Sequence, residues 1–211
     1  MGATLPIESQ LGEELDVSRT VVREAVKVLA AKGLVATRPR TGTQVRSRAD
    51  WDLLDDDVLR WTMDSGPDLA FFEDLFEVRR IIEPQAAALA AERRTETEAS
   101  RLAELLEDLE HAGGDPEAHT SADLAFHATI LEASHNELLV RLSSTLAMAL
   151  RAAREVTTRA PEATARSVPL HREIARSIID REPERAREAM LALVEYAKRG
   201  MEDILAEDAS D

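Results

Sequence analysis

The sequence predicts a mainly α-helical protein in which a small N-terminal winged helix-turn-helix precedes a larger antiparallel helical bundle. Three observations support this fold class. Strong helix formers dominate, while aromatic residues make up only 3% of the chain. From residue 68 onward, apolar residues recur with the helical period. Before that point, two helix-like segments are followed by two short β-compatible segments around a turn.

The first two segments form the expected helix-turn-helix. A helix of about two turns covers 8–15, and Asp16-Val17 makes the turn into a second helix that ends by residue 33. Ser18 is a good N-cap for the second helix, and Gly33 is a good stop signal. The first helix is expected to place three apolar residues on one side: Ile7, Leu11 and Leu15. The second is expected to bury one apolar stripe: Val22, Ala25, Val26 and Leu29.

The second helix also presents cations on a different face. Arg19 and Arg23 lie one turn apart on an exposed edge, next to Thr20 near the helix N-terminus. A helix that buries aliphatic residues and exposes cations and a hydroxyl suits the major groove of DNA. Taken alone, the segment is equally well described as a solvated amphipathic helix.

A basic hairpin follows this helix. Residues 34–37 and 43–46 are β-compatible, and the turn between them contains Arg38, Pro39, Arg40 and Gly42. Such a hairpin directly after a helix-turn-helix is typical of a wing. Its tip would bring Arg40 to a phosphate or to the adjacent minor groove.

The charge distribution separates the two parts of the chain. The net charge is −15 overall, but the first 48 residues hold eight Lys or Arg against five Asp or Glu, which leaves +3 there and −18 in the remainder. A small basic head on an acidic body indicates that only the head meets phosphate. The acidic body would repel DNA and confine contact to the head.

The domain boundaries follow from turn residues and composition. We expect a DNA-binding domain at 1–48, a linker at 49–67 and an all-helical domain at 68–208. Six helices are expected in the last domain, at 68–93, 97–112, 117–134, 136–158, 163–180 and 183–206. Short loops between them favour an antiparallel bundle, in which ligand sites lie between facing helices.

The composition excludes several classes of protein. The chain has no cysteine, so disulfides and thiolate metal sites are ruled out. No apolar run approaches the roughly 20 residues that a membrane-spanning helix needs. The N-terminus also lacks the layout of a signal peptide. The expectation is therefore a soluble, cytoplasmic protein without membrane partners.

Several stretches resemble a known family of bacterial regulators. Residues 5–45, from LPIESQ to GTQV, resemble the winged helix-turn-helix of GntR-type proteins. The stretches EVRRIIEPQAAALAA, ADLAFHATILEASHN and LHREIARSIIDREPERAREAM resemble the all-helical FCD effector domain of the FadR subfamily. The stretch WDLLDDDVLRW resembles the branch that responds to sugar acids and includes galactonate-type repressors. Because the family usually has another helix before the LP pair, the resemblance implies that the first helix of the head is missing.

The resemblance implies a set of DNA-binding residues. Two groups match the family's positions on the recognition helix and on the wing: Ser18, Arg19, Thr20 and Arg23 on the helix, and Arg40, Thr41 and Gly42 on the wing. Two such heads in a homodimer would bind a palindromic operator in double-stranded DNA.

The resemblance also implies a divalent metal in the bundle. Asp123 and His127 lie one turn apart and share a helix face, and His171 on a later helix would complete three ligands. The family's fourth ligand is usually a histidine, at a position that Leu193 occupies here. Three ligands with open positions still suit Zn or Ni. From spacing alone, an Asp/His pair is more often a structural hydrogen bond than part of a ligand set.

Arg79 matches an inward-facing arginine of the family. Its guanidinium would bind the carboxylate of a small organic acid such as a sugar acid through two parallel hydrogen bonds. The alternative is a surface ion pair with Glu83, one turn away. Three further histidines are expected at the surface: His111, His119 and His135. Three apolar residues are expected in the core: Phe126, Met148 and Met190.

The function that these patterns favour is a homodimeric, ligand-responsive transcription regulator, most simply a repressor of an organic-acid catabolic operon. One alternative is a metal-dependent helical enzyme that uses Asp123, His127 and His171. Against it, no nucleophile with a base and no Gly-rich phosphate loop is visible, and an enzyme does not need a basic wing. A second alternative is a scaffold in which the first helix pair serves only dimerisation.

Overall fold

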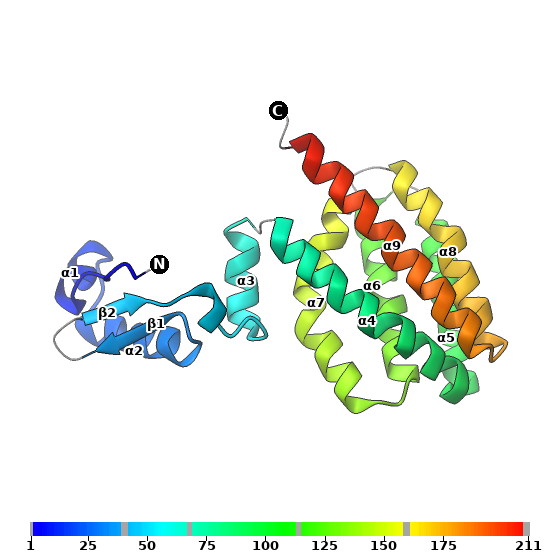
Figure 1. Ribbon diagram of the computed structural model, residues 1–211, viewed down its shortest axis with the longest axis horizontal. Coiled ribbons are helices and arrows are strands. Elements are labelled where there is room, and N and C mark those ends of the chain that lie inside the picture. Colours follow the sequence, from blue (N-terminus) through cyan, green and yellow to red (C-terminus); the bar gives the residue numbers. More distant parts are fainter. Residues whose placement is uncertain (1, 39–41, 67–68, 113–114, 158–160, 209–211) are drawn as a thin grey trace. The chain divides into compact units, whose positions relative to one another are not determined.

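A computed structural model describes five stretches of the chain: residues 2–38, 42–66, 69–112, 115–157 and 161–208. The chain divides into two units, Met1–Thr62 and Met63–Asp211, and each has its own internal contacts (Figure 1). No helix among these residues is long and apolar enough to cross a membrane.

The N-terminal unit contains the predicted helix-turn-helix and wing. Its elements are α1 (Glu8–Glu14), α2 (Arg19–Ala31), β1 (Val35–Arg38) and β2 (Gly42–Val45). The Ser18 hydroxyl caps α2 by accepting a hydrogen bond from the Val21 amide at 3.3 Å. Asp16 has a positive φ of 52°, which turns the chain sharply between α1 and α2. This part of the fold is confirmed.

The wing carries an additional extended segment. β1 and β2 pair antiparallel, from Val35 opposite Val45 to Arg38 opposite Gly42. The chain before α1 runs along the other side of β2: the Leu5 amide donates to the Thr43 carbonyl at 2.8 Å, and the Val45 amide donates to the Ala3 carbonyl at 2.9 Å. These bonds satisfy backbone groups that would otherwise lie at an open edge of the sheet.

One detail of the predicted apolar faces is wrong, and the first helix buries less than its apolar side would allow. In α2, Val22 is buried and Val26 and Leu29 are half-buried, but Ala25 is exposed, so the buried stripe is narrower than predicted. In and beside α1, Ile7 and Leu15 are each 64% exposed. The reason is that α1 has only seven residues and meets α2 around its middle, which leaves both ends of its apolar side in water.

The chain leaves α2 through a tight junction at Gly33. Gly33 has a φ of +79°, and a Cβ built there would lie 2.3 Å from the carbonyl oxygen of Asp50. The Asp52 amide donates to the Lys32 carbonyl at 3.0 Å. The Lys32 ammonium contacts the Asp55 carboxylate at 2.6 Å. The first residues after the wing are therefore fastened to the end of α2.

The expected linker, 49–67, contains secondary structure. A short 3-10 turn, η1 (Arg48–Asp50), is followed by the helix α3 (Asp56–Asp64). Val58 and Leu59 of α3 are buried, and the Thr62 hydroxyl donates to the Val58 carbonyl at 2.8 Å. The Asp55 carboxylate caps the helix by accepting from the Asp57 and Val58 amides.

The described residues of the second unit form six helices, as predicted. Their bounds lie within two residues of those expected: α4 (Leu69–Arg93), α5 (Glu96–His111), α6 (Pro116–Ala133), α7 (Glu137–Thr157), α8 (Pro161–Ile179) and α9 (Pro183–Asp208). Two of the N-termini are capped as their sequences predict. Thr95 forms a capping box with Glu98 on α5, and Asp115 caps α6.

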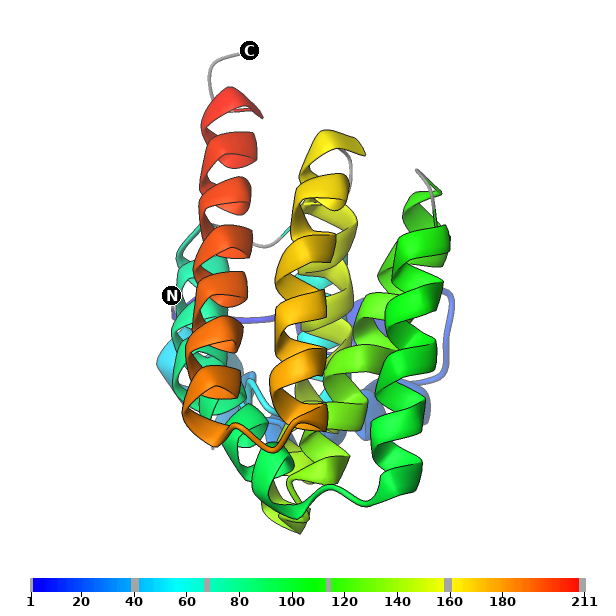
Figure 2. The ribbon, with the colours of Figure 1, turned by 90° about the vertical axis from the view of Figure 1, so that its right-hand side faces the viewer.

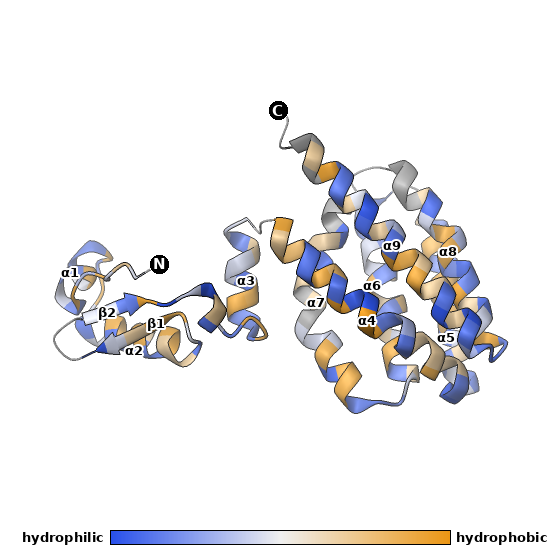
Figure 3. Ribbon diagram, viewed as in Figure 1, coloured by the Kyte–Doolittle hydropathy of each residue, from blue (hydrophilic) through white to orange (hydrophobic). Residues whose placement is uncertain are grey.

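The bundle packs around α4 and α6. Figure 2 shows α9, α8 and α5 side by side, and α4 contacts both α9 and α6. Hydrophilic and hydrophobic residues alternate along α9, as Figure 3 shows, so this helix has one face for the core, whereas the central α4 and α6 bury residues on more than one side. Phe126 and Met190 are fully buried, as predicted, whereas the side chain of Met148 lies outside the described residues.

Arginines close one end of the bundle. Arg94, which is buried, donates to the Ile179 carbonyl at the end of α8 at 2.6 Å. Arg181 donates to the Glu92 and Arg94 carbonyls at the end of α4, at 3.1 and 3.0 Å. These guanidiniums satisfy carbonyls that have no partner within their own helix, and they complement the negative ends of the helix dipoles.

Candidate functional site

The predicted DNA-contacting residues that the structure describes lie at the surface of the head. Ser18, Arg19, Thr20 and Arg23 are all exposed at the N-terminal end of α2. Arg19 and Gly42 border one cavity of about 410 Å³, so the start of α2 and the start of β2 are neighbours. Arg40 and Thr41, at the predicted tip of the wing, lie outside the described residues.

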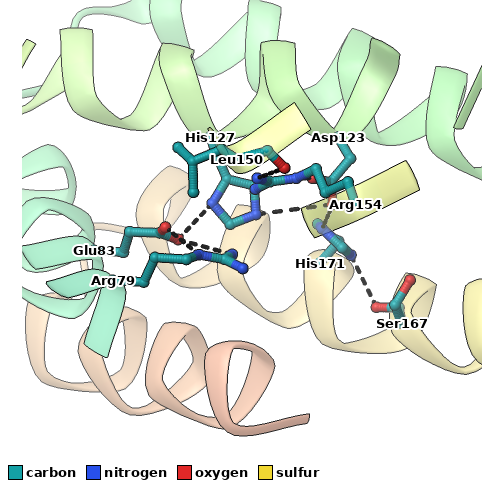
Figure 4. Close-up of polar contacts among 8 residues, drawn as sticks. All are labelled: Arg79, Glu83, Asp123, His127, Leu150, Arg154, Ser167 and His171. Atoms are coloured by element: carbon teal, nitrogen blue, oxygen red, sulfur yellow. Dashed lines mark hydrogen bonds and ion pairs between the residues drawn. The ribbon is translucent and has the colours of Figure 1, made fainter. Parts of the chain in front are cut away.

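In the bundle, the three predicted metal ligands come together. Asp123 and His127 project from α6 and His171 from α8, and one ligand atom of each lies within 4.8 Å of the others (Figure 4). Asp123, His127 and His171 are 8%, 4% and 1% exposed. A side-chain cluster of this kind, sealed from water, is compatible with binding a cation.

Two further charged residues complete the cluster, and sequence reasoning did not predict either there. Arg154 of α7 donates from Nε to the Asp123 carboxylate (Figure 4). Glu83 of α4 accepts from Arg79 Nε at 2.7 Å. The alternative of a surface pair between Arg79 and Glu83 is therefore wrong in one respect: the pair forms, but both residues are buried. The side chains lie inside because α4 packs that face against α6 and α9.

Glu83 lies between a guanidinium and an imidazole. Its Oε2 atom is 2.7 Å from His127 Nδ1, although the angle at that contact is poor for a hydrogen bond. Burial by itself would raise the pKa of the Glu83 carboxyl. The positive charge of Arg79 and the contact with His127 outweigh this effect and hold that pKa well below its usual range. Glu83 is therefore an anion at neutral pH.

The buried charges balance without any ligand. Two guanidiniums, Arg79 and Arg154, face two carboxylates, Glu83 and Asp123. Burial and the nearby charge of Arg79 lower the pKa of Arg154 to about 9, which still leaves Arg154 cationic at neutral pH. Removal of any one of the four would leave a buried charge uncompensated.

The hydrogen bonds of His171 test whether a metal fits. His171 Nδ1 lies 2.9 Å from the Ser167 carbonyl oxygen, and Nε2 lies 2.9 Å from Asp123 Oδ1. Burial lowers the pKa of His171 to about 3, so the ring is neutral and carries one proton for two acceptors. A cation between Nε2 and Asp123, with Nδ1–H donating to Ser167, would satisfy every group, and metal-bound histidines have this arrangement.

His127 supports the same conclusion, while Leu193 contributes nothing to it. His127 Nε2 is buried without a hydrogen-bond partner and lies 3.9 Å from Asp123 Oδ1, so a lone pair is free to bind a cation there. Leu193 is 3% exposed and supplies no ligand atom. The residues present fit a metal with two imidazoles and one carboxylate, provided that Arg154 leaves Asp123.

His119 corrects an expectation. It was predicted to be exposed, but its side chain is buried, one turn before Asp123 on α6. The cause is that α6 enters the core from His119 onward, where Thr120 and Ala122 are buried as well, while its first three residues are exposed. Burial lowers the pKa of His119 to about 4, and the nearby His171 and Arg154 contribute to this. His111 and His135 are exposed, as predicted.

Because His119 is buried, it should make the protein less stable as the pH falls. Its folded pKa is about 4 and its unfolded value is 6.5, so between these values only the unfolded chain takes up the proton. Stability should be full above pH 6.5 and fall towards pH 4, by up to about 3 kcal/mol from this group. Denaturant titrations at several pH values in that range should show that the free energy of unfolding changes less with pH in His119→Gln than in the wild type. An equal change in both would contradict the assignment.

Two cavities border the buried cluster. The larger, of about 620 Å³, lies between α6 and α7, and His127, Leu150, Arg151 and Arg154 are among its lining residues. Arg79 and Glu83 border a separate space of only about 30 Å³. The predicted effector residue Arg79 thus lies beside a space for one or two waters, while Arg154 borders one that would accommodate a small acid.

Comparison with known families identifies both parts of the chain. Residues 1–45 match the model of bacterial regulatory proteins of the gntR family. Residues 74–196 match the model of the FCD domain, which covers more than half of the chain. This chain belongs to the GntR family, with an FCD domain. It is a DNA-binding transcription regulator, and the proteins of this family are not enzymes.

Relatives of known role agree with this assignment. The GntR-family chain is 31% identical to the galactonate operon transcriptional repressor of Escherichia coli K12, over 96% of this chain and 89% of that one. It is 30% identical to the putative L-lactate dehydrogenase operon regulatory protein of the same organism, over 95% and 78%. Among solved structures, the Streptococcus agalactiae GntR protein aligns with a TM-score of 0.57 and 31% identity, over 94% and 90%.

Family membership corrects two alternatives. A GntR-family regulator is neither a metal-dependent enzyme nor a scaffold without DNA binding, because its N-terminal unit is a DNA-binding module. The buried cluster of Asp123, His127 and His171 is a candidate for metal binding rather than for catalysis. Arg154 was missed, although it lies four residues after Leu150 on the apolar side of α7, where a charge signals a buried partner.

Proposed function

We propose that this protein is a homodimeric repressor of an operon for the breakdown of a sugar acid or a similar small organic acid. The observation that carries the proposal is a pair of buried guanidiniums, of which Arg154 borders a cavity of about 620 Å³ and Arg79 borders the small space next to it. A guanidinium in a low-dielectric site binds a carboxylate strongly and in a fixed orientation. Relatives that regulate galactonate and L-lactate operons support an acid as the effector.

In this proposal the head contacts DNA through α2 and the wing. Arg19 and Arg23 project from one edge of α2, near its positive N-terminal end, and both are exposed. Ser18 and Thr20 add hydroxyls that bind phosphate, and Arg40, Thr41 and Gly42 supply the wing contacts. Two heads related by the symmetry of a homodimer bind the two halves of a palindromic operator.

The same proposal includes a divalent metal, Zn or Ni, held by Asp123, His127 and His171. Two observations support this metal. His171 has one ring proton for the two oxygens that face it, and Nε2 of His127 is buried without a partner. The metal would supply a positive centre for an effector carboxylate in addition to the guanidiniums. With Leu193 at the usual fourth position, water or the effector would complete its coordination.

Arg23→Ala tests the DNA contact. Fluorescence anisotropy on the upstream region of this protein's own gene should show binding that weakens as salt increases. The substitution should weaken that binding about 10- to 100-fold, because it removes a charged contact near the groove. Arg101→Ala provides a control, since Arg101 is an exposed arginine of the bundle paired with Glu104. Equal binding by the two variants would refute the role of α2.

Arg79→Lys tests the effector site. Lysine keeps the charge opposite Glu83 but cannot form two parallel hydrogen bonds with a carboxylate. Calorimetry with a panel of sugar acids should find one acid that binds the wild type and binds Arg79→Lys at least about tenfold more weakly. The same acid should release the wild-type protein from DNA in the anisotropy experiment. The matched control is Arg80→Lys, at an exposed neighbour paired with Glu195. A panel in which no acid binds the wild type would reject the effector claim.

A further inference from the structure

Both carboxylate oxygens of Asp123 already have partners within the protein. Its Oδ2 atom accepts the Nε–H of Arg154, and its Oδ1 atom lies 2.9 Å from His171 Nε2 (Figure 4). Arg154 is 5% exposed, and its guanidinium enters the cluster from α7, the helix that supplies none of the three metal ligands. The cation closest to the carboxylate is therefore part of the protein itself.

A metal and this guanidinium exclude each other for two reasons. Both need the charge of the same buried carboxylate, and they would repel each other at a separation of a few ångströms in a buried site. The charge count points the same way, since two guanidiniums and two carboxylates are neutral together. A divalent ion added to that set would leave two uncompensated positive charges.

We propose that Arg154 and a divalent metal are alternative partners of Asp123, so that Arg154 occupies the site until the metal displaces it. The inference rests on the proposed function insofar as a metal binds this site at all. Arg154 has room to leave, because it borders the cavity of about 620 Å³ between α6 and α7. Displacement turns the guanidinium towards that cavity, where the carboxylate of an effector would meet it.

The chemistry of the cluster predicts what the exchange does to the histidines. In the guanidinium-bound form, each ring nitrogen of His171 faces an oxygen atom: Nδ1 faces the Ser167 carbonyl, and Nε2 faces Asp123. In the metal-bound form, His171 Nε2 and His127 Nε2 donate their lone pairs to the ion, and His171 Nδ1–H donates to the Ser167 carbonyl. The exchange thus gives the unpartnered Nε2 of His127 a partner and leaves the contact between His171 and Ser167 in place.

Zinc affinity measured without DNA or effector tests the proposal. Metal-stripped protein is titrated with Zn²⁺ against a chromogenic chelator, for the wild type, Arg154→Gln and His171→Ala. Arg154→Gln should bind zinc at least about tenfold more tightly than the wild type, because a buried charged hydrogen bond no longer has to break. Arg151→Gln is the control, at an exposed arginine of α7 that borders the same cavity, and it should match the wild type.

A second readout keeps the test decisive if Arg154→Gln folds poorly. In the wild type, the Nε–H proton of Arg154 should exchange slowly with water and give a distinct nitrogen-15 NMR signal. Zinc should shift that signal and speed up the exchange of the proton. Zinc bound with an unchanged Arg154 signal, or zinc bound no more tightly by Arg154→Gln, would overturn the proposal. If no variant binds zinc while DNA and acid binding are intact, both the proposed exchange and the proposed metal site are wrong. That result would not contradict the proposed repressor function.

Discussion

Gly33→Val is expected to abolish DNA binding while the bundle remains folded. A valine Cβ would lie 2.3 Å from the Asp50 carbonyl oxygen, and that oxygen belongs to backbone that cannot move aside cheaply. The φ of +79° adds strain for a β-branched residue. We expect the N-terminal unit to lose more than about 3 kcal/mol of stability, enough to unfold a unit of that size. Hydrogen exchange should show lost protection in α2 and unchanged protection in α6.

Substitutions at two other glycines separate the effect of the close contact with Asp50 from the effect of backbone strain. Gly66 has a φ of +81°, but no atom lies within 4 Å of a Cβ built there, so Gly66→Val measures the strain alone. Gly200 lies inside α9, also with no atom within 4 Å of its Cβ, and Gly200→Ala should stabilise the bundle by about 0.5–1 kcal/mol. If Gly33→Val costs no more than Gly66→Val, the close approach to Asp50 has no energetic role.

Glu83→Gln is expected to destabilise the bundle by about 3–5 kcal/mol, because it leaves the charge of Arg79 buried without its carboxylate. The pair is closely bonded, at 2.7 Å, and both side chains are less than a tenth exposed. Chemical denaturation monitored by circular dichroism should report the loss directly. The expected change is large because the neighbouring Arg154 is also cationic, so two guanidiniums would face the single charge of Asp123.

A double variant tells an unpaired charge from simple loss of packing. Arg79→Met with Glu83→Leu removes both charges and keeps the volume, and it should recover most of the stability that Glu83→Gln loses. Glu104→Gln is the exposed control, since Glu104 pairs with Arg101 at the surface, and its cost should stay below about 1 kcal/mol. A double variant as unstable as Glu83→Gln would show that the fit of these side chains, rather than their charge, stabilises the site.

Local signals predicted the helices well because each end has its own chemistry. Gly and Pro residues mark the breaks, and the cap at Ser18 depends only on neighbours in the chain. The apolar faces were predicted less well. Ala25 is exposed and His119 is buried because burial depends on which helix packs alongside, and no local pattern contains that information.

In the site, too, local features were predicted from the sequence and long-range contacts were not. Asp123 and His127 are one turn apart, so the sequence alone places them together, whereas His171 was identified only through its resemblance to a family pattern. Arg154 belongs to the cluster solely because α7 packs on α6. Its partner lies 31 positions earlier in the chain, a separation that gives no sign of contact. Long-range partners of this kind were the part that could not be predicted.

The position of Arg79 and Glu83 on α4 has a mechanical consequence. α4 begins five residues after α3 ends, and Arg79 lies ten residues into the helix, before the interruption at Pro84. This stretch is a stiff lever of about 15 Å, so a tilt of only about 5° at the buried cluster moves the start of α4 by roughly 1 Å. A ligand that rearranged the four buried charges would therefore displace the first turn of α4, the helix with which the bundle begins.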